Sequence, residues 1–89
     1  GYMYVLDRQT GEVLSADPYV HTTVSKGFDL KKGIVIENPE KATGFGRTVT
    51  NICPAAPGGK DWQPVSWSPR TRLLYVPHNN LCMDMEGLE

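Results

Sequence analysis

The stretch Cys53–Cys82, CPAAPGGKDWQPVSWSPRTRLLYVPHNNLC, decides how this chain is organised. It opens with the segment Pro54–Lys60, which holds two prolines and two glycines. A run so rich in turn residues forms neither a helix nor a strand, so other contacts must hold its backbone. A covalent bridge between Cys53 and Cys82 would hold it, although an even number of cysteines permits a bridge without demanding one.

Two interpretations of this loop are open from the residues alone. Asp61 and Trp62 stand at its exit, where a pinned loop would present a polar group and an aromatic ring with little freedom, as in the wall of a ligand site. The alternative is a stapled surface loop whose Trp62 packs into a core. Composition alone favours the second interpretation.

Strand–turn–strand patterns flank the loop-rich middle of the chain. Tyr2–Leu6 is aromatic and β-branched, Asp7–Gly11 supplies turn residues, and Glu12–Ala16 reads as a second strand, which together predict a β-hairpin. Pro64–His78 repeats this plan around a turn that begins at Ser68. Two such units are compatible with successive blades of a β-propeller, although two copies do not establish a repeat.

The interval between these units also predicts strands. Tyr19–Val24, Ile34–Ile36 and Thr48–Thr50 are rich in β-branched residues, and turn residues separate them. Met85–Glu89 supplies no capping or closing element. Apolar residues nowhere recur with the period of a helix, so the predicted fold class is all-β with long loops.

Composition narrows the function classes. The chain has 89 residues, a formal net charge of −1 and 39% hydrophobic residues, which indicates at most one small globular domain. Its lysines and arginines are scattered, so no nucleic-acid-binding surface is predicted. No apolar run approaches the roughly 18 residues that a membrane span needs.

Few residues suggest chemistry by themselves. His21 and His78 lie far apart and have no ligand-spaced cysteine or histidine, so no metal site is predicted. No GxSxG motif and no phosphate-binding glycine loop is present. Arg8 stands at a strand end, where a propeller or barrel exposes its functional face. Its default interpretation is an ordinary surface arginine.

Three separated motifs carry a resemblance over essentially the whole chain: YVLDRQTGE at Tyr4–Glu12, CPAAPGGKDWQP at Cys53–Pro64 and NNLCMD at Asn79–Asp84. Together they resemble the dehydrogenases of the methanol and ethanol type that depend on pyrroloquinoline quinone (PQQ). The resemblance implies an all-β, eight-bladed β-propeller with PQQ in its central funnel. Residues 1–89 would be an internal fragment of about one and a half blades, without a complete domain.

The resemblance also implies roles for single residues. Arg8 matches an arginine that contacts the reactive quinone oxygens, where a guanidinium can stabilise negative charge, so it is the expected catalytic and cofactor-binding residue. Asp61 stands where relatives usually carry a cofactor-bonding asparagine, although an ionised aspartate cannot donate a hydrogen bond. Trp62 matches an aromatic position beside that loop, as a packing residue or a cofactor contact. Cys53 and Cys82 match a structural disulfide.

The implied function is oxidation of primary alcohols by hydride transfer to PQQ in the periplasm, with a cytochrome c-type electron acceptor. The catalytic aspartate base and the ligands of a calcium or lanthanide ion are expected upstream of Gly1, so the chain alone is expected to be inactive and to hold no metal. Whether the longer protein forms a homodimer is left open. The alternatives are a PQQ enzyme for sugars or larger alcohols and a non-enzymatic propeller scaffold that binds protein.

Overall fold

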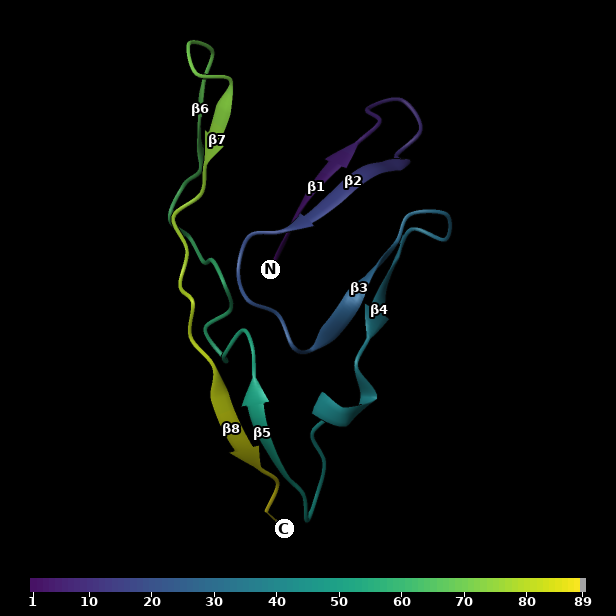
Figure 1. Cartoon of the computed structure of the whole chain (residues 1–89), viewed down its shortest axis with the longest axis vertical. Coiled ribbons are helices and arrows are strands. Elements are labelled where there is room, and N and C mark those ends of the chain that lie inside the picture. Colours follow the sequence, from purple (N-terminus) through teal and green to yellow (C-terminus); the bar gives the residue numbers. More distant parts are fainter. Residues whose placement is uncertain (89) are drawn as a thin grey trace.

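The computed structural model describes residues 1–88 of the chain, and these form eight strands and one short 3-10 helix (Figure 1). The strands pair antiparallel into four two-stranded sheets, β1–β2, β3–β4, β5–β8 and β6–β7. The elements are β1 (Tyr2–Leu6), β2 (Val13–Pro18), β3 (Ser25–Asp29), β4 (Ile34–Glu37), η1 (Pro39–Lys41), β5 (Thr48–Ile52), β6 (Ser66–Ser68), β7 (Leu73–Tyr75) and β8 (Met83–Glu86). The expected all-β class is confirmed.

The two predicted hairpins are present, and their turns share one hydrogen-bonding plan. In the first, the Asp7 carboxylate accepts from the backbone N–H groups of Gln9 and Thr10, and the Gly11 N–H donates to the Asp7 carbonyl at 2.8 Å. The same plan recurs where β3 meets β4 (Asp29–Gly33) and where β6 meets β7 (Ser68–Arg72). A side-chain acceptor at the first turn position therefore defines three hairpins of this chain.

The last position of this turn requires a left-handed backbone, which glycine adopts without steric cost. Gly11 has φ 79° and Gly33 has φ 68°, but the third turn uses Arg72 at φ 57°. Arg72→Gly is expected to raise the free energy of unfolding by about 0.5–1 kcal/mol, measured by thermal or denaturant unfolding of the protein. Arg70→Gly, at an ordinary φ in the same turn, is expected to lower it by a similar amount. Equal losses in both variants would contradict this account of the turn.

The segment Tyr19–Val24, which the sequence predicts as a strand, is a connection of bends instead. Its backbone N–H groups donate to other parts of the chain: Tyr19 to the Gly1 carbonyl at 3.0 Å and His21 to the Asn80 side chain at 3.2 Å. The prediction was wrong because these partners are scattered, so no strand ladder forms. β2 likewise begins one residue later than expected and continues to Pro18.

The C-terminal part of the chain closes a sheet that the sequence analysis did not predict. β8 pairs with β5, from Ile52 opposite Met83 to Thr48 opposite Glu86. The register shifts between Val49 and Ile52, where Asn51 has φ 53°. The expectation of no closing element is therefore wrong for Met85 and Glu86, while Glu89 lies outside the described residues.

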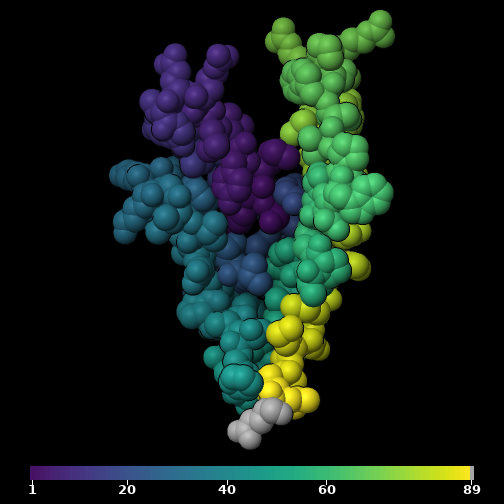
Figure 2. Space-filling view, turned by 180° about the vertical axis from the view of Figure 1, so that it is seen from behind, coloured from purple at the N-terminus to yellow at the C-terminus, as the bar shows by residue number. Residues whose placement is uncertain are grey.

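The described residues bury a small core and leave large apolar faces open. The buried hydrophobic residues are Val20, Val49, Ile52 and Cys53, whereas Phe45 is 82% exposed. The shape is long and thin, with extents of 51 × 29 × 17 Å. Figure 2 shows the β1–β2 and β6–β7 hairpins as two separate arms above a tapering end that carries β8. Within residues 1–88, no helix is long and apolar enough to cross a membrane.

Candidate functional site

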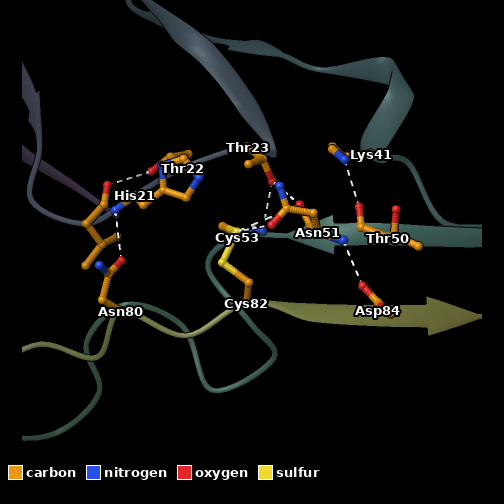
Figure 3. Close-up of a disulfide and its surroundings, with 11 residues drawn as sticks. His21, Thr22, Thr23, Lys41, Thr50, Asn51, Cys53, Asn80, Cys82 and Asp84 are labelled. Atoms are coloured by element: carbon orange, nitrogen blue, oxygen red, sulfur yellow. Dashed lines mark hydrogen bonds between the residues drawn. A yellow bond between two sulfur atoms is a disulfide. The ribbon is translucent and has the colours of Figure 1, made fainter.

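Cys53 and Cys82 form a disulfide across 29 positions of sequence, as expected (Figure 3). The bridge lies beside the Ile52–Met83 pair, at the end of the β5–β8 ladder. The Cys53 side chain is completely buried, while Cys82 is exposed. The disulfide therefore fixes the point at which the chain leaves β5 and enters the Gly/Pro loop.

Beyond the disulfide, the loop runs beside the segment that leads into Cys82. The Ala55 N–H donates to the Leu81 carbonyl at 2.8 Å, and the Asn79 N–H donates to the Gly59 carbonyl at 2.7 Å. Within the loop, the Gly58 N–H donates to the Ala55 carbonyl at 2.8 Å. These bonds supply the partners that a segment without helix or strand needs. The expected pinned loop is thus held by backbone hydrogen bonds in addition to the bridge.

Polar side chains bind the backbone of β5, the strand that leads into the loop (Figure 3). The Asp84 carboxylate on β8 accepts from the Asn51 N–H at 2.8 Å, where β5 is irregular. The Lys41 ammonium of η1 donates to the Thr50 carbonyl at 2.7 Å. No sequence pattern marks these residues, because their partners are backbone atoms made accessible by a bulge that has no sequence signal of its own.

Gly59 brings the loop against the connection that follows β2. An added Cβ at this buried position would lie 2.9 Å from Val20 Cγ2 and 3.3 Å from Tyr19 Cε2. Val20 belongs to the small core, so its side chain has little room to move. The absence of a side chain at Gly59 is therefore what allows the loop to lie against the connection after β2.

Gly59→Ala is expected to lower the free energy of unfolding by about 1–3 kcal/mol, because an inserted methyl group overpacks this contact. Gly44→Ala is the matched control, since its Cβ would meet only Arg47 Cδ, at 3.7 Å. Denaturant unfolding of both variants measures the difference. Equal stability of the two would show that the loop does not depend on this contact.

Asp61 and Trp62 stand at the loop exit with their side chains open. Trp62 is 81% exposed, so the expectation that it packs into a core of this chain is wrong. The Lys60 ammonium donates to the Asp61 backbone carbonyl at 2.8 Å and not to its carboxylate. A small cavity of about 130 Å³ lies beside them, lined by Lys60, Gln63, Pro77, His78 and Asn79. The loop thus presents a carboxylate and an indole ring beside a polar hollow.

Arg8 lies elsewhere. It occupies the exposed turn between β1 and β2, after the end at which Leu6 pairs with Val13. The loop contacts the connection after Pro18, at the opposite end of the same hairpin (Figure 1). A five-residue strand such as β1 is about 17 Å long, so Arg8 and Asp61 are not brought together within this chain.

The turn that carries Arg8 is built around the Asp7 carboxylate. Backbone hydrogen bonds from Thr10 and Gln9 lower the pKa of Asp7, since they stabilise its charged form. The charged carboxylate is thus the form of Asp7 that accepts the two backbone hydrogen bonds of this turn.

No cluster of three or more His, Cys, Asp or Glu side chains in residues 1–88 is arranged to hold a metal ion. The small set of titratable groups near the loop includes His21, His78 and Asp61, which come from separate segments. Asp61 and Trp62, both exposed at the loop exit, are the described side chains that the resemblance marks as cofactor contacts and that lie together.

Comparisons with known proteins give clear matches, although no protein-family model matches the chain. It is 46% identical over 89 residues to a lanthanide-dependent methanol dehydrogenase of Methylacidiphilum fumariolicum, covering 100% of this chain and 15% of that protein. It is 44% identical over 78 residues to the quinohemoprotein alcohol dehydrogenase ADH-IIG of Pseudomonas putida, covering 86% of this chain and 11% of that protein.

A solved structure agrees with these sequence matches. The chain superimposes on a europium-containing methanol dehydrogenase with a TM-score of 0.91 and 46% sequence identity, over 100% of this chain and 16% of that one. The chain thus spans about a sixth of the length of the proteins that it matches.

Proposed function

Because the chain belongs to the PQQ-dependent, or quinoprotein, alcohol dehydrogenase family, we propose that it is part of a longer enzyme, the intact protein, which oxidises primary alcohols with PQQ as electron acceptor. The observation that carries the proposal is the disulfide-pinned loop with Asp61 and Trp62 at its exit, inside a chain that matches these enzymes over its whole length.

We further propose that residues 1–89 form about one and a half blades of an eight-bladed β-propeller and no complete domain. Four two-stranded antiparallel sheets, three of them closed by the same turn, suit a repeated blade architecture. The open apolar faces of the chain also suit neighbouring blades that cover them, since a blade buries its faces against the next.

The residues at the loop exit fit a flat, polar cofactor. The Trp62 ring is free to lie against a ring system, and the Asp61 carboxylate is free to meet a polar edge. PQQ would supply the two-electron acceptor for hydride removed from the alcohol. The loop would hold Asp61 and Trp62 at that acceptor, and the Lys60–Asp61 backbone contact would limit their movement. Because the Arg8 turn lies at the other end of the hairpin, the proposal gives the cofactor contact to the loop exit, and the quinone contact of Arg8 stays a prediction of the resemblance alone.

Other parts of the enzyme would come from outside these 89 residues. The proposal places the aspartate base and the ligands of a lanthanide or calcium ion there, and it includes a cytochrome c-type acceptor and a periplasmic location.

The test is PQQ-dependent dye reduction by the purified intact protein with a series of short alcohols. The proposal expects turnover with at least one primary alcohol and none without PQQ. Turnover with sugars alone would favour a PQQ enzyme for other substrates. No PQQ-dependent turnover, together with no uptake of PQQ, would favour the non-enzymatic propeller scaffold.

A further inference from the structure

Thr23 lies in the irregular connection between β2 and β3, yet all of its hydrogen-bonding groups are used. Its hydroxyl donates to the Asn51 carbonyl at 2.7 Å and accepts from the Cys53 N–H at 2.9 Å. Its own N–H donates to the Cys53 carbonyl at 2.9 Å. Its carbonyl accepts from the Asn38 side chain at 2.9 Å. One residue thus holds both backbone groups of Cys53 (Figure 3).

These bonds occur where the pairing of β5 with β8 becomes irregular and then ends. The left-handed backbone at Asn51 turns its carbonyl out of the ladder, and Cys53 stands beyond the last strand pair. The Thr23 hydroxyl takes the place of a strand partner for the Asn51 carbonyl and for the Cys53 N–H, because a hydroxyl can donate and accept at once. The disulfide cannot do this, since it joins Cys53 only to Cys82, the residue just before β8, and offers no hydrogen bond to either backbone group.

We propose that Thr23 is a positioning residue for the Cys53–Trp62 loop: it sets the direction in which the loop leaves β5 and so the place of Asp61 and Trp62. The bonds at Ala55, Gly58 and Gly59 make the loop a compact unit, so a change of direction at Cys53 is carried to its exit. The consequence for PQQ binding rests on the function proposed above, but the mechanical role of Thr23 does not.

The test compares three variants of the intact protein without PQQ: Thr23→Val, Thr23→Ser and Thr22→Val. Valine keeps the shape of threonine and removes the hydroxyl, while serine keeps the hydroxyl. Thr22 is the matched control, because its hydroxyl donates only to the nearby Val20 carbonyl at 3.2 Å. Hydrogen exchange of residues 53–62 reports the loop directly and needs no activity.

We expect Thr23→Val to speed amide exchange of residues 53–59 by at least roughly tenfold, because the substitution removes both hydrogen bonds of the Thr23 hydroxyl. In Thr23→Ser and Thr22→Val the exchange rates of these residues should stay within about twofold of those in the unsubstituted protein, because both variants keep the bonds to Asn51 and Cys53. Unchanged exchange in Thr23→Val, an equal rise in Thr22→Val, or a Thr23→Val protein that unfolds or loosens uniformly would overturn the proposal.

The PQQ dissociation constant is the second readout. Thr23→Val should weaken binding by roughly tenfold and Thr23→Ser should restore it, because a displaced loop exit misplaces its contacts. If the unchanged protein takes up no PQQ, the proposed function fails while the exchange result still decides the role of Thr23. If PQQ binds equally to all variants although the loop exchanges faster, the loop exit does not set the cofactor site, and that part of the proposal is overturned.

Discussion

Removing the disulfide with the double substitution Cys53→Ala and Cys82→Ala is expected to lower the free energy of unfolding of the intact protein by about 3–4 kcal/mol. The bridge closes a segment of 29 positions, so its loss releases a long loop in the unfolded chain. Substituting both cysteines avoids a free buried thiol at Cys53. Denaturant unfolding monitored by circular dichroism measures the change.

The effect should be concentrated where the bridge holds the loop. Hydrogen exchange of residues 53–62 should rise more than exchange of the β1–β2 hairpin, because Cys53 joins the β5–β8 sheet to the loop. Ala56→Ser, an exposed change inside the closed segment, is the control and should shift stability by less than about 0.5 kcal/mol. A double variant as stable as this control would show that backbone hydrogen bonds alone pin the loop.

Asp61→Ala is expected to lower kcat of the intact, PQQ-loaded enzyme by up to about 10²-fold, because a cofactor that loses this polar contact is positioned less accurately. Asp61→Asn should retain activity within about threefold, because a neutral amide keeps an acceptor and adds a donor. Steady-state dye reduction, normalised to bound PQQ, measures both variants.

The comparison with Arg8→Ala decides which part of the chain faces the cofactor. Arg8 and Asp61 lie at opposite ends of the β1–β2 hairpin, so we expect Arg8→Ala to cost much less than Asp61→Ala. A larger loss in Arg8→Ala would instead assign the quinone contact to Arg8. Equal, small losses in both would separate the loop from the chemistry altogether.

The hairpins could be predicted because their signals are local. Asp7 and Gly11 each act within one turn, and the resulting bonds involve only the intervening residues. Resemblance also identified the Cys53–Cys82 pair correctly, and a chain with two cysteines allows only one internal pairing.

The errors come from partners far away in the sequence. The β-branched residues of Tyr19–Val24 predict a strand by propensity, but Thr23 and Val24 donate to the Cys53 carbonyl across the molecule. β8 was missed because the acidic segment Met83–Glu86 becomes a strand only through pairing with β5. Composition alone favoured packing of Trp62 into a core, but its side chain is 81% exposed in this chain. Strand propensity reflects such tertiary context more than local sequence.

The most direct test of the central claim is a crystal structure of the intact protein with PQQ bound. We expect the Asp61 side chain within about 3 Å of a polar atom of the cofactor, with the Cys53–Cys82 bridge intact behind the loop. A structure in which PQQ binds while Asp61 and Trp62 remain far from it would contradict the claim that this pinned loop forms part of the cofactor site.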